Sequence, residues 1–106
     1  SLRTKTSRLT GEWEVKFIDG EGFGGSDSEL IIEFEKGGNL NYSGKYSYYG
    51  YSNEFNYKGE WEWIDGKEKI EVIVDRDKTE WEVTRLTNEE LEFKDEDRDK
   101  WELEKL

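Results

Sequence analysis

The residue types that catalyse most reactions are scarce in this sequence. It contains no histidine and no cysteine, so it offers neither an imidazole base nor a thiolate nucleophile. Glycoside hydrolysis needs only two carboxylates about 5 to 10 Å apart, and the chain has 27 acidic residues. Most of the glutamates, however, alternate with apolar residues and are expected to face solvent from predicted strands: Glu12, Glu14, Glu33, Glu35, Glu60, Glu62, Glu71, Glu82, Glu92, Glu102 and Glu104. We therefore expect no enzymatic activity.

A glycine-rich stretch matches a phosphate-binding motif by its letters only. Residues 20–25 (GEGFGG) have the G-x-G-x-x-G spacing, which binds a dinucleotide when a helix follows it. Here residues 29–35 alternate like a strand, and the nearby carboxylate of Asp19 would repel phosphate. We interpret the stretch as a mobile loop over one end of the fold, with Phe23 at its tip. We expect no cofactor.

The acidic run at residues 95–99 (DEDRD) is similar to the start of a calcium-binding loop. Its carboxylates occupy alternate positions, as calcium ligands do in such loops. Lys100, however, stands where the loop has glycine, and Leu106 where it has a bidentate glutamate. We predict a solvated hairpin turn here and no metal site.

The charge balance argues against several classes of partner. Among 106 residues, 27 are acidic and 16 are basic, which gives a net charge of −11 and repels nucleic acids and anionic lipids. No apolar run approaches the roughly 18 residues of a transmembrane helix. The chain starts Ser1-Leu2-Arg3-Thr4 and has no methionine, so we expect that its true start, with any targeting segment, is missing.

Apolar and polar residues alternate with period two through nearly all of the chain after residue 9, a pattern typical of strands with one buried face. The eight apolar sets are Trp13, Val15 and Phe17; Leu30, Ile32 and Phe34; Leu40, Tyr42, Tyr46 and Tyr48; Tyr57, Trp61 and Trp63; Ile70, Val72 and Val74; Trp81 and Val83; Leu91 and Phe93; Trp101 and Leu103. Short polar turns join them. We predict one domain, an all-β, eight-stranded antiparallel up-and-down β-barrel, with a β-sandwich as the alternative.

The stretch YSYYGYSNEFNY, residues 46–57, has the tyrosine-rich composition with which antibody loops bind their partners. Tyr46, Tyr48 and Tyr57 share the inward phase of their strands, so we expect these three to be structural. The chain has 16 aromatic residues, five Trp, six Tyr and five Phe. We expect most of them in the core, because their burial supplies much of the hydrophobic stabilisation of so small a barrel.

The other aromatic residues of this stretch lie where the chain is expected to reverse. Tyr49, Tyr51 and Phe55 lie around Gly50 and Asn53, where we expect the reversal. With Phe23 they form a candidate binding rim at one end of the barrel, where they would stack on an apolar ligand, a sugar ring or a protein partner. The alternative is that they fold back and plug this end.

A ligand inside the barrel would contact inward-facing residues, for which the candidates are Tyr42, Tyr46, Trp61, Trp81 and Arg85. An eight-stranded barrel is just wide enough to hold one small ligand or to be filled by side chains. Arg85 shares the parity of Trp81, so its guanidinium would neutralise a ligand carboxylate or stack on a tryptophan. We favour the alternative, in which the strand ends or bulges at Thr84 and Leu86 turns inward, because buried arginine is rare.

Five segments follow one another in a recognisable order: LTGEW (9–13), EFEKGGNLNY (33–42), KGEWEWIDGKEKIEV (58–72), EWEVTRLTNEELEF (80–93) and WELEKL (101–106). The order resembles the short lipocalin-like domains of secreted bacterial lipoproteins, most familiar from the Bacteroidetes. The resemblance implies a calycin-like barrel over residues 9–106 and a spacer over residues 1–8. It also implies that Lys105 covers the first-strand tryptophan, Trp13.

The resemblance further implies a location in the periplasm, at the outer membrane or on the cell surface, with a lipidated cysteine preceding Ser1. We expect a monomeric, non-enzymatic barrel that binds a small apolar or aromatic molecule at its end. The alternative is a plugged barrel that acts as a protein or carbohydrate interaction module.

Overall fold

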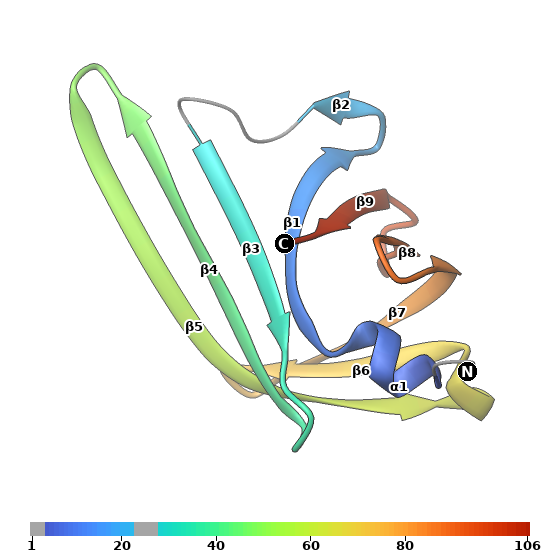
Figure 1. Ribbon diagram of the computed structural model, residues 1–106. Coiled ribbons are helices and arrows are strands. Elements are labelled where there is room, and N and C mark those ends of the chain that lie inside the picture. The colour runs from blue at the N-terminus through green and yellow to red at the C-terminus, as the bar shows by residue number, and fades with distance from the viewer. Residues whose placement is uncertain (1–3, 23–27) are drawn as a thin grey trace.

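The computed structural model describes residues 4–22 and 28–106, and most of them lie in antiparallel strands (Figure 1). The elements are α1 (Lys5–Leu9), β1 (Gly11–Ile18), β2 (Glu21–Gly22), β3 (Ser28–Phe34), β4 (Asn39–Tyr48), β5 (Tyr51–Ile64), the 3-10 helix η1 (Asp65–Lys67), β6 (Lys69–Val74), β7 (Asp77–Leu86), β8 (Glu90–Lys94) and β9 (Lys100–Lys105). Within the described ranges, no helix is long and apolar enough to cross a membrane.

The strands close into one barrel. From β3 to β9 each strand pairs antiparallel with the next, and β1 pairs with both β3 and β9. The register of β1 on β9 runs from Trp13 opposite Lys105 to Ile18 opposite Trp101. The two-residue β2 pairs with the end of β1. The prediction of an eight-stranded up-and-down barrel is confirmed, and the sandwich alternative is wrong because the first and last strands are hydrogen-bonded neighbours.

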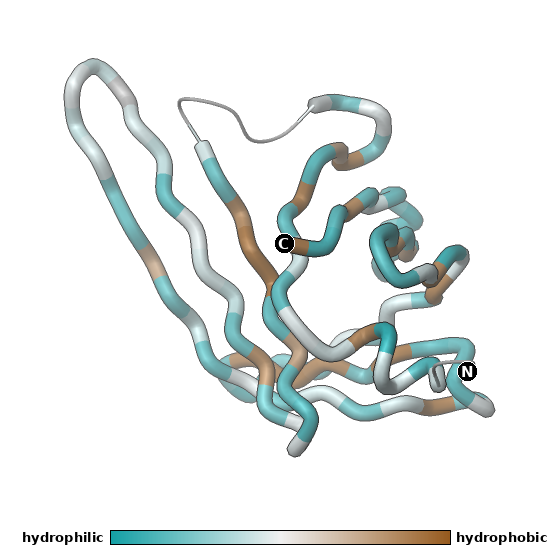
Figure 2. The backbone as a smooth tube through the Cα atoms, viewed as in Figure 1, coloured by the Kyte–Doolittle hydropathy of each residue, from teal (hydrophilic) through white to brown (hydrophobic). Residues whose placement is uncertain are grey.

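The period-two pattern of the sequence produces the core. The buried apolar residues are Leu9, Trp13, Val15, Leu30, Ile32, Phe34, Leu40, Trp61, Ile70, Val72, Leu91, Phe93 and Leu103. All of them except Leu9 lie at alternate positions of a strand, and most of the outward residues between them are polar, with Ile31 and Ile73 as exceptions. Figure 2 shows the hydrophobic positions gathered in the body of the barrel, away from the outer part of the β4–β5 hairpin.

Aromatic rings fill much of the barrel interior. Phe34 meets Trp61 and Trp81 edge to face, with ring centroids 5.6 and 6.4 Å apart. Phe93 is stacked between Trp81 at 4.4 Å and Trp101 at 5.5 Å. Such pairs contribute about 0.5–1.5 kcal/mol each beyond the burial of their area. The rings therefore fix the mutual positions of β3, β5, β7, β8 and β9.

Helix α1 closes one end of the barrel. Thr4 caps it by accepting a hydrogen bond from the backbone N–H of Ser7, and Leu9 is completely buried. The indole of Trp13 donates to the carbonyl oxygen of Leu9 at 2.8 Å, and that of Trp63 donates to Oγ1 of Thr6 at 3.0 Å. The prediction that residues 1–8 form only a spacer is therefore wrong for residues 5–8, which form a capped helix held against the barrel.

The β4–β5 hairpin extends beyond the rest of the barrel (Figure 1). β5 is 14 residues long, but only Gly59–Ile64 pair with β6. Its outer part, residues 43–56, is called the arm below. The arm ends in a two-residue turn at Tyr49 and Gly50, whose φ angles of 48° and 81° are those of a hairpin turn that matches strand twist.

Candidate functional site

The end of the barrel opposite α1 is hollow. A cup of about 470 Å³ opens there, at the base of the arm, and its lining is mostly apolar. It is lined by Leu40, Tyr42, Tyr57, Val72, Val74, Asp75, Asp77, Thr79, Trp81 and Trp101. These residues come from β4, β5, β6, β7, β9 and the β6–β7 turn. The volume lies within the range of small-molecule sites, about 300–1,000 Å³.

Two tyrosines form the wall of the cup beneath the arm. Tyr42 and Tyr57 are directly opposite each other on β4 and β5. Tyr42 is half-buried, and burial raises the pKa of its phenol. Tyr57 is 53% exposed although its strand phase points inward, because it lies just beyond Gly59, the last residue of β5 that pairs with β6. One phenol is thus held in place by packing while the other is accessible.

Two tryptophans form the opposite wall. Trp81 and Trp101 lie on either side of Phe93, in a stack of three nearly parallel rings, and both are half-buried. The indole N–H of Trp101 donates to Oδ2 of Asp95 at 2.9 Å. The stack and this hydrogen bond fix the orientation of the Trp101 ring, so its exposed part is preorganised for a contact.

The acidic run forms the turn between β8 and β9, as predicted. Oδ1 of Asp95 accepts from the backbone N–H groups of Asp97 and Asp99 at 2.9 and 3.0 Å. The carboxylates of Asp95, Asp97 and Asp99 offer oxygens within 4.8 Å of one another. Burial, and then the charges of Asp95, Asp19 and Asp97, raise the pKa of the Asp99 carboxyl. Both oxygens of Asp95 therefore organise the turn, which also places carboxylates close together.

The five predicted interior residues lie in four different places, of which the four aromatic residues occupy three. Tyr42 and Trp81 line the cup. Trp61 is buried beside Phe34 and is not part of the lining. Tyr46 is 48% exposed on the arm, so its predicted place in the interior is wrong, because the arm extends past the strands that would have covered it.

Arg85 lies outside the barrel. Its guanidinium is exposed and pairs with Glu90 at 3.1 Å. The register of β7 on β8 shifts between Val83 and Arg85, and Leu86 packs against the core. The predicted entry of Arg85 into the barrel is therefore wrong, and the favoured alternative, a bulge at Thr84 with Leu86 turned inward, is confirmed.

The predicted rim residues do not form one group either. Tyr49 and Tyr51 stand at the tip of the arm, 85% and 75% exposed. Phe55 is not in a reversal but within β5, where it is half-buried, lies opposite Gly44 and packs between Tyr42 and Tyr57 at 6.0 and 5.7 Å. Phe23 lies outside the described residues. Only the two tip tyrosines are displayed as a rim would require, and their contact with a ligand stays a prediction.

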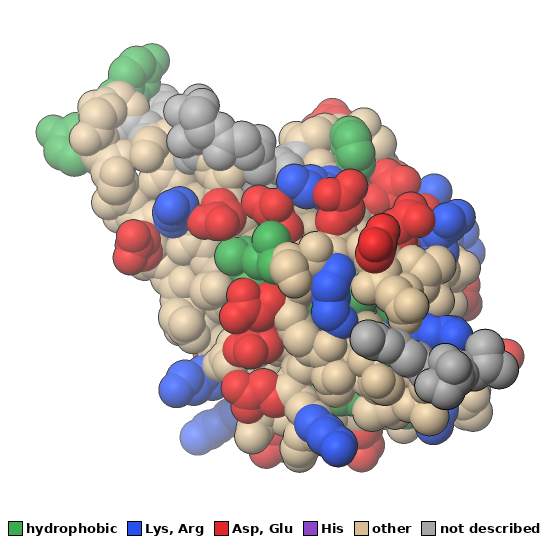
Figure 3. All heavy atoms as spheres, viewed as in Figure 1, with side chains coloured by type: hydrophobic (Ala, Val, Ile, Leu, Met, Phe, Trp, Pro, Cys, Tyr) green, Lys and Arg blue, Asp and Glu red, His purple; other side chains and the backbone are tan. Residues whose placement is uncertain are grey.

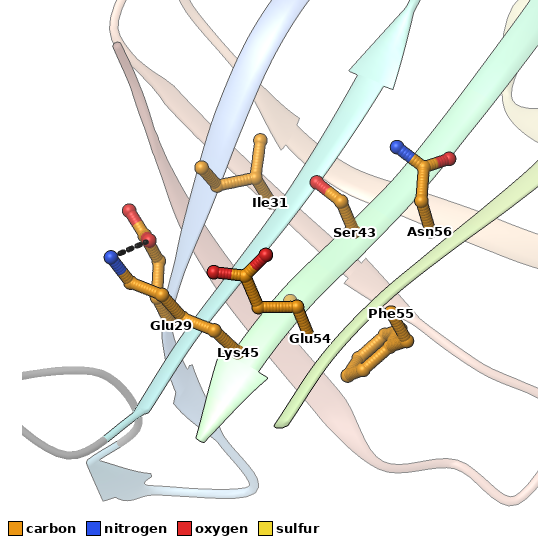
Figure 4. Close-up of a pocket in the computed structure, with 8 residues that line it drawn as sticks. Glu29, Ile31, Ser43, Lys45, Glu54, Phe55 and Asn56 are labelled. Atoms are coloured by element: carbon orange, nitrogen blue, oxygen red, sulfur yellow. Dashed lines mark ion pairs between the residues drawn. The ribbon is translucent and has the colours of Figure 1, made fainter. Parts of the chain in front are cut away.

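A second hollow of about 360 Å³ lies on the other face of the arm. Figure 4 shows Ile31, Ser43 and Asn56 there, beside an ion pair between Lys45 and Glu29 whose N–O distance is 3.5 Å. Most of its lining residues are polar and face solvent from their strands, and Phe55 is its only aromatic residue among those described. Because it lacks the converging aromatic rings of the cup, it is the weaker binding site of the two.

The sequence did not identify several residues of the cup. Trp101 has the inward parity of its strand and could have been included on that signal. Asp77 and Thr79 share the parity of Trp81 on β7 and could have been included on the same signal, whereas Asp75 could not, because it lies in the β6–β7 turn, where no strand phase shows which way a side chain faces. Figure 3 shows many acidic side chains over the surface in view, with hydrophobic ones standing out at the end of the arm.

The fold has a counterpart among solved structures. The chain is similar to a lipocalin-like protein from Bacteroides uniformis ATCC 8492 with a TM-score of 0.70 and 15% sequence identity, over 93% of this chain and 99% of that chain. At this identity the likeness shows a shared fold alone. No protein-family model and no curated protein matches the chain.

Proposed function

We propose that this protein is a non-enzymatic binding barrel that holds one small apolar or aromatic molecule in the cup at its open end. The observation that carries the proposal is the cup itself, about 470 Å³, with Tyr42 and Tyr57 on one side and Trp81 and Trp101 on the other. Aromatic side chains that converge on a cavity are the common lining of small-molecule sites. The lipocalin-like fold supports the same function.

The size and stiffness of the cup limit the ligand. A volume of about 470 Å³ fits a molecule of one or two rings, since the packed rings of Phe34, Trp61 and Phe93 already occupy the interior next to the cup. Stacking on each available ring contributes about 0.5–1.5 kcal/mol. The stacked Phe93 and the Asp95 hydrogen bond hold Trp81 and Trp101 in place, so little conformational entropy is lost when a ligand binds.

The proposal is tested by filling the cup. Tryptophan fluorescence and thermal melting are followed against a panel of fatty acids, retinoid-like molecules, haem, short glucans and small aromatic amines. A ligand that binds the native state raises its melting temperature. Val74→Trp fills the cup and is expected to abolish that rise. Its control is Ile73→Trp, on the adjacent residue of β6, which does not line the cup. Binding that survives Val74→Trp would place the site elsewhere.

A second candidate function is a protein interaction module, favoured by the open edge of β5. Among the described residues, no strand pairs with the side of residues 51–58 that faces away from β4. Hydrogen-bonded pairs alternate along a hairpin and begin next to its two-residue turn, so the N–H groups of Ser52, Glu54, Asn56 and Lys58 point to this edge. An extended segment of a partner protein would add a strand here.

The two functions are separated by variants of the arm. Asn56→Pro removes one edge N–H without breaking the β4 ladder, and it is expected to abolish binding of peptides selected against the edge from a displayed library. Tyr49→Ala with Tyr51→Ala tests the contribution of the arm tip. Ligand binding in the cup is expected to be unchanged by all three substitutions, because none of these residues lines it.

The proposal includes the expected location outside the cytoplasm, in the periplasm, at the outer membrane or on the cell surface, with a lipid anchor. It rests on the resemblance of the sequence to secreted lipocalin-like domains. Fractionation of cells that express the full-length gene, with metabolic labelling by a fatty acid, tests it. Unlabelled protein in the cytoplasmic fraction would overturn both parts.

A further inference from the structure

Acidic residues outnumber basic ones around the cup. Asp75 and Asp77 are its only charged lining residues, and no lysine or arginine within the described ranges forms an ion pair with either. The described turns at this end of the barrel carry further carboxylates, at Asp19, Asp95, Glu96, Asp97 and Asp99. The basic residues in and beside these turns are fewer: Arg76, Lys78, Lys94, Arg98 and Lys100. The whole chain has a net charge of −11. The potential at the mouth of the cup is therefore negative.

The rings of the cup add a second source of negative potential. The faces of tryptophan and tyrosine attract cations through the ring quadrupole, most strongly for tryptophan. Trp101 donates its indole N–H to a carboxylate oxygen of Asp95 at 2.9 Å. A charged acceptor on the N–H shifts electron density onto the indole, so the exposed part of this ring becomes a better partner for a cation.

We propose that the cup selects organic cations, an amine or quaternary ammonium group carried on an apolar or aromatic body. The body fills the space between the tyrosine pair and the tryptophans, and the charged group lies at the mouth beside Asp75 and Asp77. This assignment rests on the proposed function and names its ligand class. It disfavours fatty acids and other carboxylates, because Arg85, the one basic residue considered as a candidate for the barrel interior, is exposed and paired with Glu90.

The test compares three probes that share one ring system and differ in charge: tryptamine, indole-3-ethanol and indole-3-propionate. Their dissociation constants are measured by calorimetry on the intact chain. Tryptamine is expected to bind about fivefold more tightly than indole-3-ethanol, and indole-3-propionate more weakly than both. Higher ionic strength is expected to reduce the difference in dissociation constant between tryptamine and the other two probes, because salt screens the exposed carboxylates at the mouth.

The charge variants identify the source of the selectivity. Asp75→Asn with Asp77→Asn is expected to reduce the tryptamine preference to less than about twofold while indole-3-ethanol binds as before. Glu60→Gln with Glu62→Gln removes the same charge from the outer face of β5, away from the cup lining, and is expected to preserve the preference.

Each result has a definite meaning. If the three probes have equal dissociation constants and Val74→Trp abolishes the binding of each, the cation assignment is overturned while the proposed function is supported. A preference that the Asp75 and Asp77 variants do not change would also overturn it. If none of the three probes binds, the cation assignment is overturned, and the proposed function then depends on whether another member of the wider panel binds in a way that Val74→Trp abolishes.

Discussion

The ammonium nitrogen of Lys105 lies 4.5 Å from the centroid of the Trp13 ring. It also donates to the carbonyl oxygens of Arg8 and Thr10 at 2.9 and 2.6 Å. One side chain of the last strand thus joins the first strand to the segment that begins with α1. It satisfies carbonyls near the helix end that water would otherwise solvate.

Removing this ammonium group is expected to destabilise the closed end of the barrel. Lys105→Met keeps the aliphatic stem but loses two charge-assisted hydrogen bonds and a cation–π contact. We expect a loss of about 2 kcal/mol in the free energy of unfolding, measured in urea. Lys36→Met, at an exposed position, is the control and is expected to change stability by less than about 0.5 kcal/mol. Equal effects of the two would show that Lys105 contributes nothing specific.

Phe34 is expected to be a main determinant of barrel stability. Its ring is fully buried and contacts both Trp61 and Trp81 edge to face. Phe34→Leu leaves a gap that the tryptophans cannot fill, at a cost of about 2 kcal/mol in unfolding free energy. Phe17→Leu, on a ring that is 45% exposed, is expected to cost much less. Denaturant titration of both variants compares them, and similar midpoints would contradict the packing described here.

Gly59 is expected to be irreplaceable where the arm leaves the barrel. A Cβ at this position would collide with the carbonyl oxygen of Ile73 and with Val74 on β6. Gly59→Ala should therefore force the two strands apart and lower the melting temperature. Gly37→Ala is the matched control, because a Cβ there meets no atom within 4 Å. If the two variants have the same melting temperature, β5 and β6 do not approach each other closely at Gly59, and the prediction is wrong.

Asp99 is expected to make stability depend on pH. Its folded-state pKa is raised, first by burial and then by Asp95, Asp19 and Asp97. The folded state therefore loses stability as pH rises through that pKa, and the loss disappears below the unfolded pKa of about 3.9. Asp99→Asn should raise the melting temperature at about pH 7 and make no difference at about pH 3. If Asp99→Asn raises the melting temperature equally at about pH 3, the gain does not come from the ionisation of Asp99, and the prediction is wrong.

The alternation of apolar and polar residues predicted the eight strands and their turns, because period two fixes which side chains share a face. It did not predict whether another strand covers that face. Tyr46 and Tyr57 have the inward phase, yet both are about half exposed, since they lie in the part of the β4–β5 hairpin that extends past β6, which pairs with β5 only from Gly59 on. Helix α1 was missed because five residues with one buried side chain show no periodicity.

Two further details were predicted from sources other than periodicity. The contact of Lys105 with Trp13 followed from the family resemblance and is confirmed. The bulge at Thr84 followed from the rarity of buried arginine. The reversal was expected to involve Gly50 and Asn53, whereas the chain turns within two residues at Tyr49 and Gly50. That difference moves Phe55 into the strand and away from the predicted rim.

The most direct test of the binding cup is an NMR titration that follows the five indole N–H signals while tryptamine is added. Trp81 and Trp101 line the cup, whereas Trp13 and Trp63 donate their indole N–H groups at the α1 end. Single Trp→Phe variants assign the signals. The account predicts saturable shifts of the Trp81 and Trp101 signals, with those of Trp13 and Trp63 unchanged. Shifts confined to Trp13 and Trp63, or no shift at all, would contradict it.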